Sequence, residues 1–409
     1  MNRAHTPNPI ALHRAELTAA GLELTDLTDT NPTRYGLFDP QILDIIAAHL
    51  PRASRYEPHP RGPWPARAAL AERYGGDPED YWLVSSTSEA YGWLFTLLAD
   101  PGDSVAIPSP GYPLIEPLAQ FHSLTASSYR TFYVHPAGWE LDRDSLEEIL
   151  TGDSGDPDYV RMTTGDGDPD FVRMTGPDRM TKGKVRALVA VNPNNPTGAY
   201  ADPAIAAMAA DHGLPLIADE VFFPFQLSDA PYHVRLSGNE STLTFGLDGL
   251  SKLLAAPQLK LGWIRLSGPI SEKRKTAEAL DEIADAYLSV NTPVALALPD
   301  LLDLADSSIT RITTRLKTNL ATAHKLFEDT RIRTVYGGWM MLLDVPPLMD
   351  ADDLCISLMD KAGLYVHPGY FYDLPDSTLA ISLLPDPRIF EESCHRLSSA
   401  FDLLISDEF

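Results

Sequence analysis

The chain has 409 residues, of which 44% are hydrophobic and 22% are charged, a composition typical of a globular protein. This length exceeds what a single core of ordinary size holds, so we expect two domains. With 57 acidic and 32 basic residues, the net charge of −25 argues against nucleic acid and anionic membranes as partners.

Other classes of protein also do not fit the sequence. No apolar run approaches the roughly 20 residues of a transmembrane helix, and residues 1–17 lack the apolar segment of a signal peptide. Cys355 and Cys394 match neither a disulfide framework nor a metal-ligand spacing. We therefore expect a soluble, cytoplasmic enzyme for small molecules, with no metal, nucleic-acid or membrane partner.

The first part of the chain alternates between helical and extended patterns. We expect helices at 9–22, 41–50, 64–74 and 89–98. We expect strands at 24–27, 81–84 and 104–108. Asn31, Pro32 and Thr33 predict a turn, and breaker residues predict a loop over 56–62.

Two polar segments in this part are candidates for binding. Ser86 and Thr87 lie in a hydroxyl-rich stretch between the strand 81–84 and the next helix, where hydroxyl and N–H groups bind anions or simply cap the helix. Tyr112 follows the strand 104–108. In open α/β sheets, ligands bind at the carboxyl edge of the strands, so we expect Tyr112 near a ligand.

Residues 151–183 differ from the rest of the chain. The segment Gly155–Thr163 is repeated, with one change, as Gly167–Thr175. Two copies are too few for a solenoid, and the carboxylate spacing does not match an EF-hand. We interpret the segment as a duplicated surface insertion without a catalytic role.

A strand–helix alternation resumes after this insertion. Short apolar strands are expected at 185–191, 214–218, 242–247 and 261–266, with helices at 203–210 and 271–287. This pattern predicts a parallel sheet. Beyond it, helices at 299–327, 351–362 and 388–405 and strands at 335–345, 364–367 and 378–383 predict an α+β domain.

Three motifs follow three of these apolar strands. They are Asn192-Pro-Asn-Asn-Pro-Thr-Gly198, Asp219-Glu-Val-Phe222 and Gly249-Leu-Ser-Lys252. A lysine beyond a small-residue turn at the end of a buried strand would have a lowered pKa and a free amine that attacks carbonyl groups. Taken alone, Lys252 would be read as a surface lysine, so its interpretation depends on the other two motifs.

Together with Pro257–Trp263, these motifs resemble the class I/II aminotransferases, the pyridoxal 5′-phosphate (PLP) enzymes of the aspartate-aminotransferase superfamily. The resemblance covers nearly the whole chain and implies fold type I. That α/β fold has a large domain with a mostly parallel seven-stranded sheet and a smaller α+β domain from both chain ends. The implied domains are 1–45 and 289–409 for the small domain and 46–288, with the insertion 151–183, for the large one.

The resemblance also implies an activity and its central residues. An amino group would move from an amino acid to a keto acid by a ping-pong mechanism, through a Schiff base on Lys252 that also shuttles the Cα proton. Asp219 would keep the pyridine nitrogen of PLP protonated, and Asn195 would donate to the phenolic oxygen. Without the other motifs, Asp219 would be a helix cap and Asn195 a turn residue.

The resemblance assigns further residues to the cofactor. Tyr112 would stack on the pyridine ring, and Phe222 stands where many relatives have a tyrosine. The residues implied for the phosphate are Ser86, Thr87, Ser251 and Lys260, with Tyr56 reaching the cofactor of a neighbouring subunit. A homodimer with shared active sites is therefore implied.

The chain departs from the family pattern on three counts. Phe222 removes a hydroxyl donor to the cofactor, and Lys260 replaces the fork of an arginine with a point charge. Ala380 stands where relatives have an arginine that clamps the substrate carboxylate. The candidates for substrate binding are Asn31, Arg34, His367 and Tyr370; surface or structural roles are the alternatives for Arg34 and His367.

Two other enzymatic interpretations remain open. A PLP-dependent lyase of the β-C–S type would use the same cofactor residues, and Ala380 is compatible with a cofactor-binding enzyme whose substrate site is degenerate. A non-catalytic PLP-binding regulator is disfavoured because the sequence has no basic DNA-binding extension.

Overall fold

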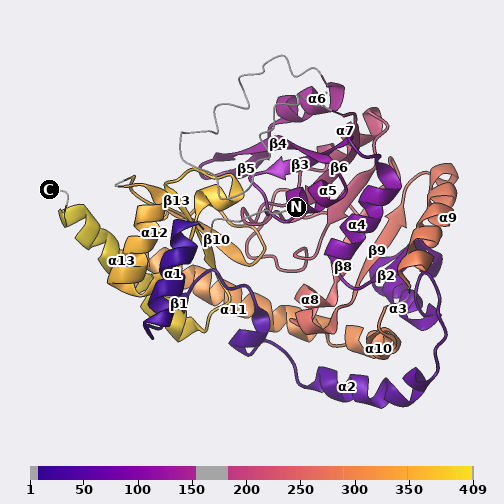
Figure 1. Cartoon of the computed structure of the whole chain (residues 1–409), viewed down its shortest axis with the longest axis horizontal. Coiled ribbons are helices and arrows are strands. Elements are labelled where there is room, and N and C mark those ends of the chain that lie inside the picture. The colour runs from indigo at the N-terminus through magenta and orange to yellow at the C-terminus, as the bar shows by residue number, and fades with distance from the viewer. Residues whose placement is uncertain (1–7, 153–182, 289, 348, 408–409) are drawn as a thin grey trace.

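An eight-stranded sheet forms the centre of the larger lobe of the molecule (Figure 1). The computed structural model describes residues 8–152, 183–288, 290–347 and 349–407, so the repeat predicted as a surface insertion lies outside the described residues. The sheet order is β2-β9-β8-β7-β6-β3-β4-β5. The strands are β2 (Tyr81–Val84), β3 (Ser104–Ser109), β4 (Thr125–Val134), β5 (Gly138–Leu141), β6 (Val185–Val191), β7 (Leu216–Asp219), β8 (Thr244–Gly249) and β9 (Gly262–Ser267).

The middle of this sheet is parallel and its borders are antiparallel. Strands β4, β3, β6, β7 and β8 run in the same direction, β9 is antiparallel to both β8 and β2, and β5 is antiparallel to β4. The seven strands implied by the resemblance are thus one too few, and the six strands expected from the sequence pattern are two too few. Strands β4 and β5 gave no signal because β4 is rich in polar residues and only partly buried, and β5 is a short hairpin partner at the edge.

The apolar runs in the sequence are explained by helices on both faces of the sheet. In β6, Val189 packs into the layer with α4 (Thr87–Leu98), α5 (Ile115–Phe121) and α9 (Ile270–Tyr287). Leu188 packs on the opposite face with α6 (Arg143–Thr151) and α7 (Ala204–Asp211). Strands buried on both faces need no polar alternation, and burying each such side chain contributes about 1.5–3 kcal/mol.

A third group of helices covers the end of the sheet formed by β2 and β9. Helices α2 (Gln41–His49), α3 (Trp64–Tyr74) and α10 (Thr292–Leu302) share a buried cluster with Trp263 of β9. The helix expected at 299–327 is in fact two helices, α10 and α11 (Ala305–Leu326). The prediction missed the start of α10, although Asn291 caps that helix by accepting a hydrogen bond from the Val294 N–H at 3.2 Å.

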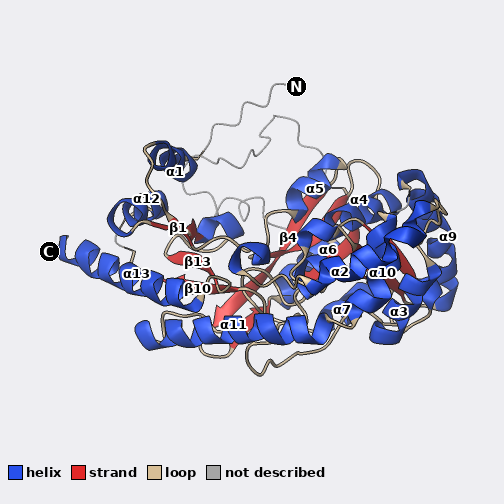
Figure 2. Ribbon diagram, turned by 90° about the horizontal axis from the view of Figure 1, so that it is seen from below, coloured by secondary structure: helices blue, strands red, loops and turns tan. Residues whose placement is uncertain are grey.

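Segments from both ends of the chain build the smaller lobe, as expected. It contains the antiparallel sheet β10-β13-β12 and the parallel pair β1-β11. Figure 2 shows α11, α12 and α13 around these strands. The elements are α1 (Pro9–Ala19), β1 (Thr25–Asp26), β10 (Met340–Asp344), α12 (Ala351–Ala362), β11 (Leu364–Tyr365), β12 (His367–Pro368), β13 (Thr378–Ser382) and α13 (Pro387–Asp407).

Short helical turns connect these elements. They are α8 (Leu250–Leu253) and the 3-10 helices η1 (Pro32–Tyr35), η2 (Leu50–Ser54), η3 (Pro78–Asp80), η5 (Pro257–Leu259) and η6 (Gly369–Tyr372). The core of the smaller lobe extends into the larger one, because Phe222 and Phe225 pack in the same cluster as Met341 and Ile381. Across the described residues, no helix combines the length and the apolar character that a membrane span requires.

Candidate active site

Three adjacent parallel strands end side by side in the larger lobe. Val191 of β6 pairs with Asp219 of β7, which pairs with Leu247 of β8. The backbone N–H of Asn192 donates to the Asp219 carbonyl at 2.8 Å, and that of Glu220 donates to the Leu247 carbonyl at 2.9 Å. The three motifs found in the sequence therefore meet at one carboxyl edge of the sheet, where open α/β sheets bind ligands.

Lys252 lies on α8, directly after β8, close to two aromatic rings that contact each other. Its Nζ is 5.3 Å from the ring centroid of Phe222 and 5.0 Å from that of Trp339. Burial lowers the pKa of Lys252 to about 8, and the neighbouring carboxylate of Asp219 opposes that shift. A larger fraction of the amine is therefore neutral near pH 7 than in an ordinary lysine, as a nucleophile or base requires.

Asp219 has a defined hydrogen-bonding environment at the end of β7. Its Oδ2 accepts from the Tyr91 hydroxyl at 3.2 Å, and its Oδ1 accepts from the Val221 N–H at 3.3 Å. Burial raises the pKa of Asp219 to about 6, and the Val221 N–H, the Tyr91 hydroxyl and Lys252 all oppose the rise. The carboxyl group is thus ionised at neutral pH, beside the amine of Lys252.

The loop after β6 brings Asn195 to the same edge. The Asn195 Oδ1 is buried and has no hydrogen-bond partner within the described part of the chain. The adjacent Asn194 donates its Nδ2 to the Pro110 carbonyl at 2.8 Å, which ties this loop to the loop carrying Tyr112. A buried polar atom without a partner costs free energy, so Asn195 is a candidate to contact a ligand.

The amino end of α4 carries the predicted anion site. Ser86 caps this 12-residue helix and accepts a hydrogen bond from the Glu89 N–H at 3.2 Å, while the Glu89 carboxylate accepts from the Ser85 N–H at 2.6 Å. Thr87 is the first helical residue. Capping and anion binding are therefore compatible, because free N–H groups and the helix dipole remain at this end.

The other predicted cofactor residues have varied surroundings. Ser251 is partly buried beside Lys252 on α8, while Lys260 is exposed just after η5. The Tyr112 side chain is 44% exposed. Tyr56 lies in the loop after η2 and is 67% exposed.

Of the predicted substrate residues, His367 has the strongest connection to this edge. Its Nδ1 lies 3.0 Å from the Tyr372 hydroxyl, and the Tyr372 carbonyl accepts from the Gly111 N–H at 3.2 Å, next to Tyr112. Burial lowers the pKa of His367 to about 4, so the imidazole is neutral at neutral pH. His367 can orient a ligand through a hydrogen bond but carries no charge for a carboxylate.

Asn31 and Arg34 form local contacts around η1. The Asn31 Oδ1 accepts from the Thr33 N–H at 3.1 Å and from the Thr33 hydroxyl at 2.7 Å, which makes it the cap of η1. The Arg34 side chain is 67% exposed and forms an ion pair with Asp29 at 2.8 Å. Their assignment to the substrate stays a prediction.

Tyr370 and Ala380 belong to the smaller lobe. The Tyr370 hydroxyl donates to Asp352 of α12 at 2.6 Å. Ala380 is fully buried on β13, opposite Leu342 in the strand register, in an apolar cluster that includes Trp139. The position where the resemblance implies an arginine is therefore enclosed by apolar side chains.

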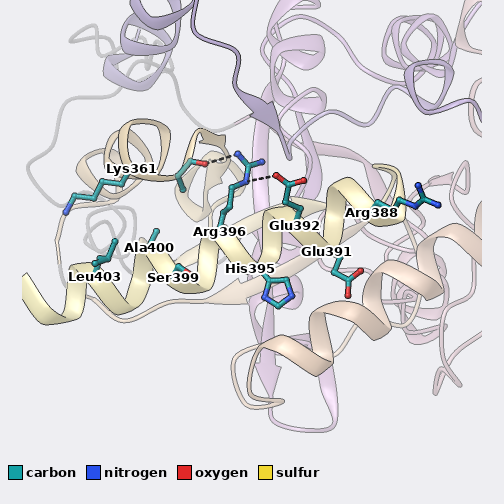
Figure 3. A pocket seen from close by; sticks show the side chains of 10 residues that line it. Lys361, Arg388, Glu391, Glu392, His395, Arg396, Ser399, Ala400 and Leu403 are labelled. Carbon is teal, nitrogen blue, oxygen red and sulfur yellow. Dashed lines mark hydrogen bonds and ion pairs between the residues drawn. The ribbon is translucent and has the colours of Figure 1, made fainter.

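A separate pocket of about 540 Å³ lies in the smaller lobe (Figure 3). It is lined by residues of α12 and α13, where Arg396 donates to the Ala362 carbonyl at 3.0 Å and lies 4.0 Å from Glu392. None of the predicted site residues lines it. Within the described residues, no group of three or more His, Cys, Asp or Glu side chains is arranged to hold a metal ion.

Comparison with known proteins identifies the family. The model of the family described as aminotransferase class I and II matches residues 51–397. The chain belongs to this family. Two curated members are an alanine aminotransferase of Mycobacterium tuberculosis strain H37Rv, 29% identical over 303 residues, and the glutamate-pyruvate aminotransferase AlaA of Escherichia coli K12, 25% identical over 305 residues.

These matches cover different shares of the two chains. The mycobacterial match covers 71% of this chain and 62% of that protein, and the E. coli match covers 72% and 67%. Among solved structures, an alanine aminotransferase from Pyrococcus furiosus has a TM-score of 0.79 over 96% of both chains at 21% identity, which establishes the shared fold. The expected fold type I is thereby confirmed.

The residues at the carboxyl edge fit the cofactor of this family, PLP. Lys252 offers an amine for its aldehyde, Asp219 offers a carboxylate for its ring nitrogen, and Asn195 offers a side-chain amide whose Nδ2 can donate to its phenolic oxygen. The capped end of α4 offers donors for its phosphate.

Two residues at this site were missed by the sequence analysis. Tyr91 lies one helical turn after Thr87, and this spacing of four residues would have placed it on the same face of the helix. Trp339 comes from the smaller lobe and meets Phe222 edge-on at 5.4 Å. No local pattern in the sequence signals a contact between positions so far apart.

Proposed function

We propose that this protein is a PLP-dependent aminotransferase that moves an amino group from an amino acid to a keto acid in two half-reactions. The observation that carries this proposal is the pair formed by Lys252 and Asp219, in which burial lowers the pKa of the amine and raises the pKa of the carboxyl group. The bound cofactor supplies the electron sink that lets the substrate Cα lose a proton.

The proposed roles follow from what each side chain can donate or accept. Lys252 would hold the cofactor through Nζ and, once its amine is free, would serve as the base that moves the proton of the substrate Cα. Asp219 keeps a proton on the ring nitrogen, because a nearby carboxylate favours the protonated form. Asn195 donates its amide to the phenolic oxygen.

The remaining cofactor contacts hold the phosphate and the ring. Ser86, Thr87 and Ser251 are proposed to donate to the phosphate, with Lys260 as the cation. Tyr112 is proposed to stack on the ring as a flat apolar surface. Together these contacts would hold the cofactor at its phosphate and at its ring.

We further propose a homodimer in which Tyr56 contacts the cofactor of the other subunit. Four exposed apolar side chains lie in residues 43–64, from α2 to the start of α3, and exposed apolar surface of this kind favours a subunit interface. They are Leu43 at 55%, Leu50 at 52%, Tyr56 at 67% and Trp64 at 54% exposure.

This dimer can be tested by mixing two impaired variants. Tyr56→Ala and Lys252→Ala subunits, unfolded and refolded together, would form heterodimers with one intact site. About a quarter of all sites would then be active, since half of the dimers are mixed. No recovery of activity would contradict the shared site, and a monomer in light scattering would contradict the dimer.

The substrate proposal starts from the names of the relatives. Since these are alanine and glutamate-pyruvate aminotransferases, L-alanine and L-glutamate are the first amino donors to test. Arg34, Asn31, His367 and Tyr370 are proposed to bind the substrate, with Arg34 turning from Asp29 to the carboxylate. The match covers 62% of the mycobacterial protein, so the substrates of that protein are proposed for this chain and not assigned to it.

A second candidate function rests on Ala380. This residue is fully buried among apolar side chains, so no cation occupies the position that clamps the carboxylate in relatives. A cofactor-binding enzyme with a degenerate substrate site is the alternative that this observation favours.

The visible spectrum of the PLP-loaded protein separates these proposals. The absorption band should decrease with L-alanine or L-glutamate, and the matching keto acid should appear. Release of pyruvate, ammonia and a thiol from a cysteine conjugate would instead indicate a lyase. If no α-amino acid changes the band, the aminotransferase proposal fails in favour of the degenerate site.

A further inference from the structure

Tyr91 links two parts of the site that lie far apart in the sequence. It sits on α4, one turn beyond Thr87, and its ring is buried at 2% exposure beside Phe95, 5.7 Å between ring centroids. Its hydroxyl donates a hydrogen bond to the Asp219 Oδ2 at 3.2 Å. The helix whose amino end carries Ser86 and Thr87 therefore also touches the carboxylate at the end of β7.

We propose that Tyr91 is a positioning residue, whose hydroxyl keeps Asp219 ionised and fixes the orientation of its carboxylate. This inference rests on the proposed function in one respect, the role of Asp219 at the ring nitrogen of PLP. Tyr91 itself acts through Asp219. Because one rigid helix then holds both the phosphate donors and this carboxylate, α4 sets the position of the two ends of the cofactor relative to each other.

The hydrogen bonds of Asp219 explain how its orientation is fixed. Each carboxylate oxygen receives one protein donor, Tyr91 at Oδ2 and the Val221 N–H at Oδ1. A carboxylate has about four acceptor directions, so one direction on each oxygen remains for a ligand. Without the hydroxyl, Oδ2 would lose its donor, and the carboxylate could rotate about the Cβ–Cγ bond.

The charges around Asp219 explain why a donor is needed. Lys252 on α8 faces it, and Glu220 follows it on its own strand end. Burial and Glu220 raise the pKa of Asp219, while the Val221 N–H, the Tyr91 hydroxyl and Lys252 lower it. Removing a donor to the charged form should therefore raise the pKa of Asp219 further.

Tyr91 is suited to be a permanent donor. Burial, with a further contribution from Asp219, raises the pKa of Tyr91 well above its ordinary value. The hydroxyl thus keeps its proton throughout the working pH range of the protein. A phenylalanine would fill the same space without this donor, which makes Tyr91→Phe the appropriate variant.

The first test titrates Asp219 in the cofactor-free protein by infrared spectroscopy, with Asp219→Asn used to assign its carboxyl band. We expect Tyr91→Phe to raise the midpoint of this titration by about one pH unit or more, because hydrogen bonds to charged groups are among the stronger ones. The matched control is Tyr81→Phe, which removes a buried hydroxyl donating to the Gly75 carbonyl at 2.6 Å. An unchanged midpoint, or an equal shift in the control, would overturn the proposal.

The second test measures the Kd for PLP by equilibrium binding. We expect Tyr91→Phe to weaken binding about tenfold and Tyr81→Phe to leave it within about twofold, since only Tyr91 orients the carboxylate toward the cofactor. Equal Kd values for wild type and Tyr91→Phe would contradict the orienting role. If the wild type does not bind PLP at all, the proposed function fails instead, and the infrared titration still decides whether Tyr91 controls Asp219.

Discussion

The site has two sides that are built differently. The cofactor edge comprises Asn192–Gly198, Asp219–Phe222 and Gly249–Lys252, each of which begins at the last residue of a buried parallel strand or directly after it. The proposed substrate face comprises Asn31, Arg34, His367, Tyr370 and Ala380, which come from the start of η1 and from the second half of the smaller lobe. Strand pairing brings the cofactor edge together, whereas no strand pairing joins the proposed substrate residues to that edge.

The two sides also differ in charge. On the cofactor edge, burial shifts the pKa values of Lys252 and Asp219 toward each other, to about 8 and about 6. On the substrate face, His367 is neutral at neutral pH and Arg34 is already paired with Asp29. The cofactor edge therefore holds an amine and a carboxyl group with shifted pKa values, while the proposed substrate face offers a charge that is already part of an ion pair.

The largest expected effect comes from breaking the cofactor edge at Lys252. Lys252→Ala removes both the attachment point and the base, so kcat should fall by at least about 10³-fold and the visible band of the bound cofactor should disappear. The control is Lys273→Ala, which removes a lysine paired with Asp80 at 2.6 Å. If Lys252→Ala keeps the band, the assignment of the central lysine is wrong.

The sequence indicated which three segments meet at the carboxyl edge of the sheet because its signals there are local. Lys252, Asp219 and Asn195 each follow an apolar run, and parallel pairing of those runs is enough to bring the three together. Strands β4 and β5 were missed for the opposite reason, since β4 reads as a polar segment and is only partly buried. The observed sheet therefore has more strands than expected, and the additional strands lie at its least buried border.

Contacts between distant segments explain what the sequence did not predict at the site. Trp339, in the loop before β10 of the smaller lobe, lies 5.0 Å from the Lys252 Nζ. Tyr91 on α4 donates a hydrogen bond to Asp219. Ala380 could be matched to a family position, but its apolar surroundings on β13 could not be inferred from β13 alone. Only the spacing of four residues between Thr87 and Tyr91 could have indicated that Tyr91 lies at the site.

The next prediction concerns a buried carboxyl group behind the cofactor edge, Asp248 of β8. Its Oδ1 accepts from the Gly249 N–H at 2.8 Å, but its Oδ2 is buried without a hydrogen-bond partner among the described residues and lies 3.6 Å from Arg235. Burial raises the pKa of Asp248 to about 7. The folded state thus binds this proton more tightly than the unfolded state does, and stability falls as the pH rises from about 4 to about 7.

Asp248→Asn should remove this pH dependence. Since the raised pKa corresponds to roughly three units, the variant should be more stable than wild type at pH 8 by up to about 4 kcal/mol and similar near pH 4. Urea unfolding at both pH values measures the difference. Asp103→Asn is the control of opposite sign, because the Asp100 N–H and Arg186 lower the pKa of Asp103. Equal stability of wild type and Asp248→Asn at pH 8 would contradict the prediction.

A smaller effect is expected on the substrate face at Arg34. If this side chain turns to the substrate carboxylate, Arg34→Ala should raise KM for the amino donor by up to about tenfold and change kcat less, because solvent screens the interactions of an exposed charge. The matched control is Arg143→Ala, since Arg143 pairs with Asp202 at the same 2.8 Å and is 61% exposed, close to the 67% of Arg34. Similar KM values for the two variants would exclude Arg34 from substrate binding.

The smallest effect tests the cofactor edge at Phe222. This ring is 7% exposed, and its centroid lies 5.3 Å from the Lys252 Nζ and 5.4 Å from the Trp339 ring. Phe222→Tyr would add a hydroxyl donor to the phenolic oxygen of the cofactor. Hydrogen bonds to a charged form stabilise it, so the visible band should titrate at a pH lower by up to about one unit.

The neighbouring residue provides the control for this change. Phe223 stacks on His233 at 4.8 Å between ring centroids, with 14° between the ring planes, and lies under Arg235, so Phe223→Tyr adds the same hydroxyl among different neighbours. A shift in Phe222→Tyr but not in Phe223→Tyr would show that a hydroxyl at position 222 reaches the cofactor. If the visible bands of the two variants titrate at the same pH, the lack of a tyrosine at position 222 does not control the charge of the cofactor. The charges at this edge would then depend on Lys252 and Asp219.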